Sequence, residues 1–389
     1  MFNTKQYKTK TFYRKRNNGS VKGASLSAID VGYSSVKIFS ENLAGVFPSY
    51  AVRSSKEAVW TPPDTHIVYR DIDSGEQWLV GEAAQDEVSQ GDATVSEQAV
   101  FARTRYDDPM FLVLARTGIG IGMTEEEYER RNGKPLHLQT GLPPRYMEGG
   151  DVKELKNALA ARHRFGLKVG SAPERIYDIT VPRENIGVME QPKGTLMSIA
   201  MDNSHRFVPG AKEYFSKNIL IFDAGFETLD IYPIKNNHVG DKQTFTQFSM
   251  RQVFKETIDV IRDKYGEDVS LIGFQRCLGD GYVRCHGKFN SRNQEFGDIL
   301  EAVSADVCDR AMEMLGQIYG LYEYDYLVIT GGTGAAWNAM IREKLKGLET
   351  LTIVEGNQND TSLPFMLANV RGYYMYLYEK LSRAVAKRG

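Results

Sequence analysis

The sequence predicts an α/β protein of two related domains. At 389 residues the chain is longer than a single hydrophobic core usually organises. An apolar strand that ends in an aspartate and turns through a glycine into a second apolar strand occurs twice, at residues 28–39 and 220–232. A third strand, residues 326–330, leads through consecutive glycines into a helix. Two copies of one hairpin indicate two halves of related topology.

Composition excludes several classes of protein. The net charge of -2 argues against direct DNA binding by the folded body, because a general nucleic-acid binder needs an excess of Lys and Arg. No apolar run reaches the roughly 18 residues of a membrane span, and the N-terminus lacks a signal-peptide core. Three cysteines without a CxxC pair fit a reducing compartment. We therefore expect a cytoplasmic protein that does not contact membranes.

The first 24 residues are basic and contain no Asp or Glu. Their composition favours a solvated, disordered tail. The alternative is an arm that contacts an acidic partner, DNA or a neighbouring copy of the chain.

The first hairpin carries polar side chains at its turn. Backbone N–H groups near Gly32, with the hydroxyls of Ser34 and Ser35, form a donor site that suits phosphate oxygens, and Lys37 adds a positive charge. Asp30 is then available to a hydrated magnesium ion, which prefers one or two carboxylates. The hairpin therefore predicts half of a phosphate site.

The second hairpin repeats this pattern with Asp223, Gly225, Thr228 and Asp230. Taken alone, it is more typical of an ordinary polar turn. Together, the two hairpins predict two halves that close on one phosphate chain.

The segments between the hairpins predict a small lobe and a candidate catalytic carboxylate. Residues 41–110 indicate a strand-rich lobe followed by a helix, and the charged run 123–134 indicates a solvated face and loop. Glu190 stands just ahead of a helix, where it could orient a water for attack on a terminal phosphate. The alternative is an acidic residue placed by the helix dipole.

The second half predicts helices around one further glycine turn. Residues 250–265 are amphipathic, residues 266–298 look irregular, and residues 303–319 and 363–387 indicate long helices. Gly331 and Gly332 end a strand, where a planar base or a phosphate can approach the backbone. A βα turn without a ligand is the other interpretation.

Three segments in this order resemble the phosphate-1, phosphate-2 and adenosine motifs of the actin-like ATPase superfamily. They are Asp30-x-Gly-x-Ser-x-x-Lys37, Asp223-x-Gly-x-x-Thr-x-Asp230 and Thr330-Gly-Gly-Thr333. Residues 79–84, 141–144 and 368–373 are similar to the bacterial ParM and Alp proteins. The resemblance covers nearly all of the chain after residue 25.

The resemblance implies an actin-like fold: two related α/β domains with a nucleotide cleft between them, each with a smaller inserted subdomain. Domain I is expected at 25–205 plus 361–389 with 41–110 as its subdomain. Domain II is expected at 206–360, with a subdomain at about 251–302.

The resemblance also implies the site. Its cofactors are ATP or GTP with Mg²⁺, its catalytic residues are Glu190 and Asp223, and its metal-binding carboxylates are Asp30 and Asp223. The remaining nucleotide-binding positions are Gly32, Ser34, Ser35, Lys37, Gly225, Thr228, Asp230, Gly331, Gly332 and Thr333. Tyr33 stands where actin has a phosphate-contacting Ser, and Phe226-Glu227 places an acidic residue where phosphate is expected to approach.

Proteins of the ParM and Alp type segregate plasmids. The implied function is a filament that assembles with nucleotide, hydrolyses it, and works with a ParR-like DNA-binding adaptor on a centromere-like DNA site. The alternatives are a monomeric small-molecule kinase of the same superfamily, a chaperone-like nucleotide switch and a nucleotide-free binding module.

Overall fold

The computed structural model describes residues 3–54, 63–88, 105–286 and 290–387. They form two compact units. Of the described residues, the first unit contains 10–54, 63–88, 105–212 and 356–387, and the second contains 3–9, 213–286 and 290–355. The sequence predicts the change of domain at residues 205/206 and 360/361, whereas the contacts divide the chain at 212/213 and 355/356.

The first unit is built on a six-stranded mixed sheet. Its order is β1-β4-β3-β2-β8-β11, in which β1 to β4 pair antiparallel, whereas β8 is parallel to both β2 and β11. The strands are β1 (Phe12–Lys15), β2 (Ser25–Val31), β3 (Ser35–Ser40), β4 (Leu43–Pro48), β8 (Leu136–Leu142) and β11 (Ile186–Glu190). β2 and β3 form the first hairpin, as the sequence predicted.

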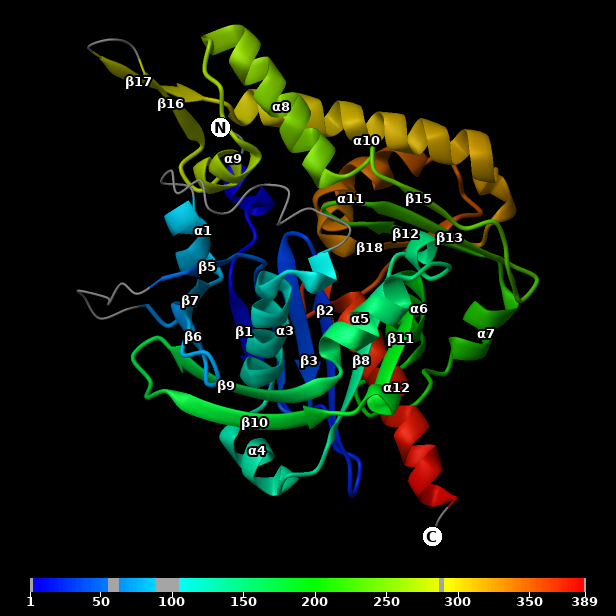
Figure 1. Ribbon diagram of the computed structural model, residues 1–389. Helices are drawn as coiled ribbons and strands as arrows, with labels where there is room; N and C mark the ends of the chain where they lie inside the picture. The colour runs from blue at the N-terminus through cyan, green and yellow to red at the C-terminus, as the bar shows by residue number, and fades with distance from the viewer. Residues whose placement is uncertain (1–2, 55–62, 89–104, 287–289, 388–389) are drawn as a thin grey trace. The chain divides into compact units, whose positions relative to one another are not determined.

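Two helices cover opposite faces of this sheet (Figure 1). α12 (Ala368–Ala386) packs its buried tyrosines against Leu26, Ala28 and Phe39. α3 (Pro109–Gly122) lies on the other face, so close that a Cβ on Gly118 would lie 2.7 Å from Ile29 Cδ1. Because side chains alternate along a strand, Asp30 shares the face of Ala28, on which α12 packs.

A second sheet forms the small lobe of the first unit. Its order is β10-β9-β6-β7-β5. The strands are β5 (Ala51–Arg53), β6 (Ile67–Asp71), β7 (Gln77–Val80), β9 (Ala161–Val169) and β10 (Arg175–Val181), and α1 (Glu82–Val88) follows β7. The predicted lobe at 41–110 was wrong in two respects. β4 belongs to the main sheet, and β9 and β10, distant in sequence, complete the lobe because β9 pairs with β6.

The second unit repeats the topology of the first. Its sheet has the order β14-β13-β12-β18-β19, and β15 also pairs with β13. The strands are β12 (Ile219–Ala224), β13 (Leu229–Lys235), β14 (His238–Val239), β15 (Gln243–Phe245), β18 (Tyr326–Thr330) and β19 (Thr352–Glu355). As in β2–β3 followed by β8 and β11, an antiparallel hairpin continues into two parallel strands. The predicted relation between the two halves is therefore present in the strand order.

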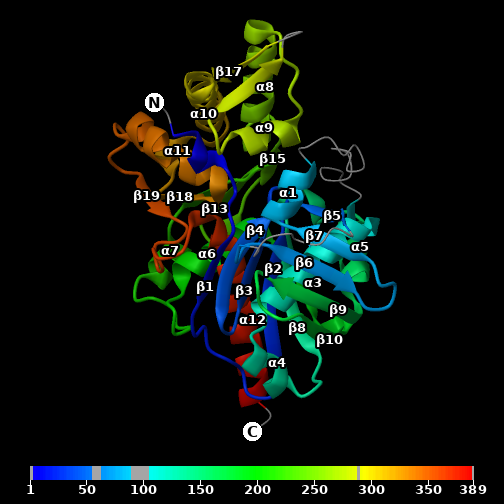
Figure 2. The ribbon, with the colours of Figure 1, turned by 90° about the vertical axis from the view of Figure 1, so that its left-hand side faces the viewer.

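Helices and a short ribbon complete the second unit. They are α8 (Met250–Tyr265), α9 (Leu271–Cys277), β16 (Tyr282–His286), β17 (Ser291–Glu295), α10 (Gly297–Tyr319) and α11 (Gly331–Leu345). The predicted helix at 250–265 is confirmed, with Gly266 ending it in the left-handed conformation (φ 69°). The expectation of irregular structure at 266–298 was wrong, since α9 and the β16–β17 ribbon lie there (Figure 2).

The N-terminal segment is ordered over the described residues, which corrects the predicted disordered tail. Residues 12–15 form β1, which pairs with β4 from Phe12↔Val46 to Lys15↔Leu43. Two of its cations are used internally, because Arg14 donates to Ser362 O and Arg16 pairs with Asp360. Tyr7, in the 3₁₀ turn Thr4–Tyr7, donates to Ser304 within the second unit.

The charged run 123–134 is also more structured than predicted. It contains α4 (Glu125–Arg131), and Glu127 is buried against Asn42. Three further helices are α5 (Asp151–Leu159), α6 (Gln191–Ala200) and α7 (Ala211–Ser216). None of the helices described here combines the length and the apolar character that crossing a membrane requires.

Candidate functional site

The first hairpin holds Asp30 between a cation and an amide. Asp30 and Lys37 are directly opposite in the antiparallel register, and their Oδ2 and Nζ atoms are 2.8 Å apart. Gln191 Nε2, at the start of α6, donates to Asp30 Oδ1 over 3.3 Å. Asp30 is 2% exposed, so these partners compensate a carboxylate that is withdrawn from bulk water.

The turn of the first hairpin is compact. The N–H of Gly32 donates to Ser35 O over 2.9 Å, and the carbonyl of Ser34 accepts from Ser49 N. A Cβ on Gly32 would lie 3.4 Å from Lys37 Nζ, so the ammonium group lies beside the glycine. The structure therefore brings together all five predicted residues of this hairpin.

Glu190 lies at the same end of the sheet as Asp30. β2, β8 and β11 are parallel, so the ends of β2 and β11, where Asp30 and Glu190 lie, point the same way. Glu190 is the N-cap residue of α6, but its side chain makes no capping bond; it pairs with Lys193 at 2.9 Å. Of the two neighbours Glu190 and Gln191, it is Gln191 that reaches Asp30. The sequence feature that could have identified Gln191 is its place as a second polar residue at a helix start, directly after the end of a strand.

The second hairpin places two carboxyl groups opposite each other. Asp223 and Asp230 are register partners and are 5% and 1% exposed. Asp230 accepts hydrogen bonds from Thr228 Oγ1 at 3.1 Å and Thr244 Oγ1 at 2.5 Å. Burial, helped by the charge of Asp223, raises the pKa of Asp230 to about 8. At neutral pH this pair therefore carries less than two negative charges.

The glycine turn after β18 lies against the second hairpin. Asp223 pairs in parallel register with Thr330, the N-cap residue of α11. Gly331 has φ 84°, and a Cβ there would lie 2.1 Å from Ala224 O, so only glycine fits. Thr333 Oγ1 donates to Gly225 O over 2.6 Å, and Gly332 lies in the first turn of α11. The predicted phosphate-2 and adenosine residues thus form one cluster within the second unit.

The two unusual residues of the second turn are held by α8. Glu227 pairs with Arg251 at 2.6 Å, so its charge is compensated by a cation. The Phe226 ring contacts Phe254 edge-on, with centroids 5.9 Å apart. Arg251 was not among the predicted site residues. The sequence feature that could have identified it is a basic residue in the first turn of the helix that follows the hairpin.

The residues suit a nucleotide and a hydrated Mg²⁺ in their chemistry. Asp30 in the first unit and Asp223 in the second each offer carboxylate oxygens, the donors that Mg²⁺ prefers, and a magnesium ion that keeps most of its waters needs only one or two carboxylates. In the described ranges no three His, Cys, Asp or Glu side chains gather into a dedicated metal cage. Thr330 Oγ1 is buried and has no hydrogen-bond partner among the described residues. That orphaned hydroxyl, at the start of a 15-residue helix, is available to a polar ligand.

Comparison with known proteins identifies the architecture. Residues 28–194 match the model of the N-terminal domain of actin-like proteins. No curated protein sequence matches the chain significantly.

Three solved structures illustrate the shared fold. A non-polymerisable quadruple mutant of pCBH ParM has a TM-score of 0.69 at 17% identity, covering 91% of this chain and 99% of its own. A 15-stranded ParM filament from Clostridium botulinum has a TM-score of 0.66 at 16% identity, covering 92% and 99%. The archaeal actin homologue Ta0583 in complex with ADP has a TM-score of 0.57 at 13% identity, covering 94% and 100%. Residues 28–194 therefore match the actin-like family, and the chain has the actin-like fold over nine tenths of its length.

Proposed function

We propose that this protein binds ATP or GTP with Mg²⁺, hydrolyses it, and assembles into filaments in the cytoplasm. The observation that carries the proposal is the repeated hairpin. Asp30 and Asp223 lie near the ends of equivalent strands, because in each unit an antiparallel hairpin is followed in the sheet by two parallel strands. Two of the structures with this fold are an ADP complex and a filament, which supports nucleotide binding and assembly here.

Each described group has a part in the proposed site. Lys37 and the turn at Gly32–Ser35 bind phosphate, and Gly331, Gly332 and Thr333 accept the nucleoside. Asp30 of the first unit and Asp223 of the second would hold a hydrated Mg²⁺ through its water shell, and the ion would supply charge neutralisation of the phosphates. Glu190 orients the attacking water, while Gln191 fixes Asp30 through its amide.

Light scattering and sedimentation test assembly. The protein is mixed with Mg-ATP or Mg-GTP over a range of protein concentrations, with nucleotide-free protein as the reference. We expect nucleotide-dependent polymer that disassembles as nucleotide is hydrolysed. Absence of polymer with both nucleotides at every concentration would refute a filament protein.

Phosphate release tests the reaction. Asp223→Ala should abolish turnover, whereas Asp268→Asn, at an exposed position of the same unit, should leave it unchanged. Turnover that requires an added small acceptor would favour a kinase, and turnover without polymer would favour a chaperone-like switch. Unchanged function in Asp223→Ala would favour a nucleotide-free binding module.

The proposed cellular role is plasmid segregation with a ParR-like adaptor bound to a centromere-like DNA site. The test is retention of a plasmid that carries the gene and its flanking DNA, compared with the same plasmid encoding Asp223→Ala. Equal loss of both plasmids would contradict this role without affecting the biochemical proposal.

A further inference from the structure

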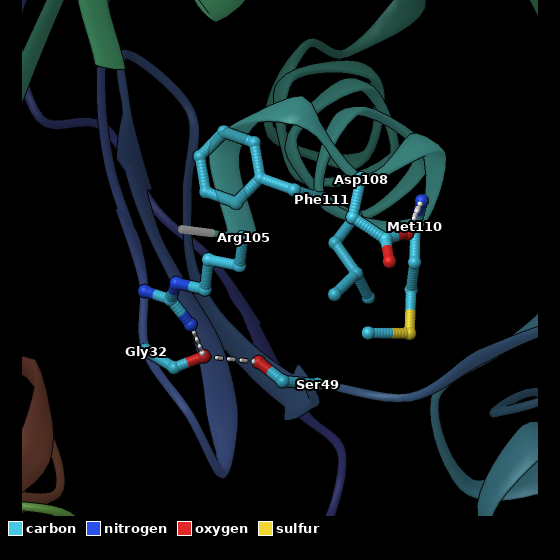
Figure 3. Close-up of a pocket in the computed structure, with 7 residues that line it drawn as sticks. Gly32, Ser49, Arg105, Asp108, Met110 and Phe111 are labelled. Atoms are coloured by element: carbon cyan, nitrogen blue, oxygen red, sulfur yellow. Dashed lines mark hydrogen bonds between the residues drawn. The ribbon is translucent and has the colours of Figure 1, made fainter. Parts of the chain in front are cut away.

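One arginine donates hydrogen bonds to the backbone of the first hairpin's turn. Arg105 lies in the 3₁₀ turn Arg105–Asp107 that leads into α3. Its guanidinium donates to the carbonyls of Val31 and Gly32, the latter over 3.1 Å, and Ser49 Oγ donates to the same Gly32 oxygen over 2.8 Å. Figure 3 shows Arg105 and Ser49 converging on that oxygen.

Two aromatic rings also contact the guanidinium of Arg105. The Arg105 guanidinium lies 4.2 Å from the centroid of Tyr33 and 5.7 Å from that of Phe111. Three successive residues of the turn therefore contact one side chain. In the described part of the chain, its partners are carbonyl oxygens and ring faces, so a positive charge is held beside the turn.

These contacts orient the backbone of the turn. In a planar trans peptide, the C=O and the N–H point in opposite directions. Because Arg105 and Ser49 hold the Gly32 carbonyl on one side, the N–H of Tyr33 in the same peptide is directed to the other. The fork geometry of arginine is needed, since a lysine cannot hold two carbonyls in a fixed plane.

The second unit holds its hairpin in a comparable way. Arg251, in the first turn of α8, pairs with Glu227, and its own N–H donates to Phe226 O over 2.9 Å. Both arginines lie near the start of a helix, Arg105 in the 3₁₀ turn that precedes α3 and Arg251 in the first turn of α8. The difference is that Arg251 has a carboxylate partner, whereas Arg105 grips neutral groups.

From this arrangement we propose that Arg105 is the positioning residue of the first phosphate turn, fixing its backbone donors for a nucleoside polyphosphate. This inference rests on the proposed function.

Nucleotide binding tests the proposal in the full chain. Isothermal titration with Mg-ATP and Mg-GTP is performed on wild type, Arg105→Ala, Arg105→Lys and Ser49→Ala. Loss of two charge-assisted hydrogen bonds should weaken binding about tenfold in Arg105→Ala. Arg105→Lys should stay close to that value, and Ser49→Ala should lose about twofold to threefold. Full rescue by Arg105→Lys would overturn positioning in favour of charge alone.

Arg116→Ala is the matched control. Arg116 lies on α3 and bonds Tyr69 and Asp71 of the second sheet, away from the turn. It should lower thermal stability while leaving the nucleotide Kd within about twofold of wild type. If Arg105→Ala does not fold, Arg105→Lys and Ser49→Ala carry the test.

Hydrogen–deuterium exchange separates this inference from the proposed function. Without nucleotide, the peptide spanning residues 31–36 should exchange faster in Arg105→Lys than in wild type and Arg116→Ala. If exchange rises as expected but neither wild type nor any variant binds nucleotide, the proposed function fails. The conclusion that Arg105 orders the backbone of the turn is then retained. If wild type binds nucleotide and neither exchange nor Kd changes at Arg105, the inference fails alone.

Discussion

At the scale of single residues, burial changes the pKa of Asp230 at the candidate site. Its pKa of about 8 lies above the ordinary 3.8, so folding favours the protonated acid. This contribution to stability is complete below pH 4 and is lost as pH rises toward 8. A threonine hydroxyl can donate or accept, so an amide at this position keeps partners in Thr228 and Thr244.

Asp230→Asn should therefore flatten the dependence of stability on pH. Relative to wild type, we expect the variant to gain about 1 kcal/mol or more in the free energy of unfolding between pH 5 and pH 8.5. Urea denaturation at both pH values measures it, with exposed Asp268→Asn as the control. Burial likewise raises the pKa of Glu127 to about 8, so only the difference between variant and wild type is diagnostic. Parallel curves would contradict the prediction.

The Glu227–Arg251 pair predicts opposite effects of its two members on nucleotide binding. Arg251→Ala leaves Glu227 uncompensated beside the second turn, so the affinity for Mg-nucleotide should fall about tenfold. Glu227→Gln removes the negative charge and should keep or raise the affinity. Titration calorimetry on both variants and on the double variant gives the comparison. Equal loss in both single variants would mean that the pair acts only through stability.

At the scale of elements, the crossing of α6 and α12 depends on two glycines. A Cβ on Gly372 would lie 1.7 Å from Gly194 O, and a backbone atom cannot move aside cheaply. Thr195 Oγ1 also bonds Asn369 Oδ1 at 2.6 Å across the same contact. Because Gln191 starts α6, this crossing also sets the support of Asp30.

Gly372→Ala should therefore cost about 3 kcal/mol of stability and weaken nucleotide binding. Gly316→Ala is the control, because a Cβ there meets nothing within 4 Å. Alanine also has a higher helix propensity than glycine at this position inside α10. Thermal unfolding and calorimetry distinguish the two. A Gly372→Ala protein as stable as wild type would show that the helices can separate without loss.

The sequence predicted these elements where its local pattern was strong. Both hairpins and α8 follow from apolar runs, turn glycines and helical periodicity. β9 and β10 were not recognised as part of the small lobe, because pairing with β6 depends on residues about 100 positions away. Lys37 was predicted as the positive charge of the first hairpin. Gln191, Arg105 and Arg251 were not, because their contacts arise from packing between separate segments.

At the scale of the whole molecule, the N-terminal segment closes the edge of the main sheet. β1 pairs with β4, all six residues of which are buried. Two of its cations, Arg14 and Arg16, contact Ser362 and Asp360 within the first unit, so these two serve this attachment. An open β4 edge would offer unpaired backbone groups to other chains.

Deletion of residues 1–16 should therefore lower the temperature of unfolding and cause aggregation. Static light scattering during a thermal ramp measures both. A triple variant, Lys5→Ser, Lys8→Ser and Lys10→Ser, removes charge but keeps β1, and it should stay monomeric without nucleotide. If the triple variant aggregates like the deletion, charge repulsion and not the edge strand keeps the protein soluble.

The order of segments also constrains folding during synthesis. The core of the first unit includes Tyr373 and Tyr374 of α12, which the ribosome makes after residues 213–355 of the second unit. Domains generally fold as units while the chain emerges. The second unit can therefore form its sheet while the first, although begun earlier, still exposes the face of Leu26, Ala28 and Phe39. That exposed face is where a nascent chain would need protection by a chaperone.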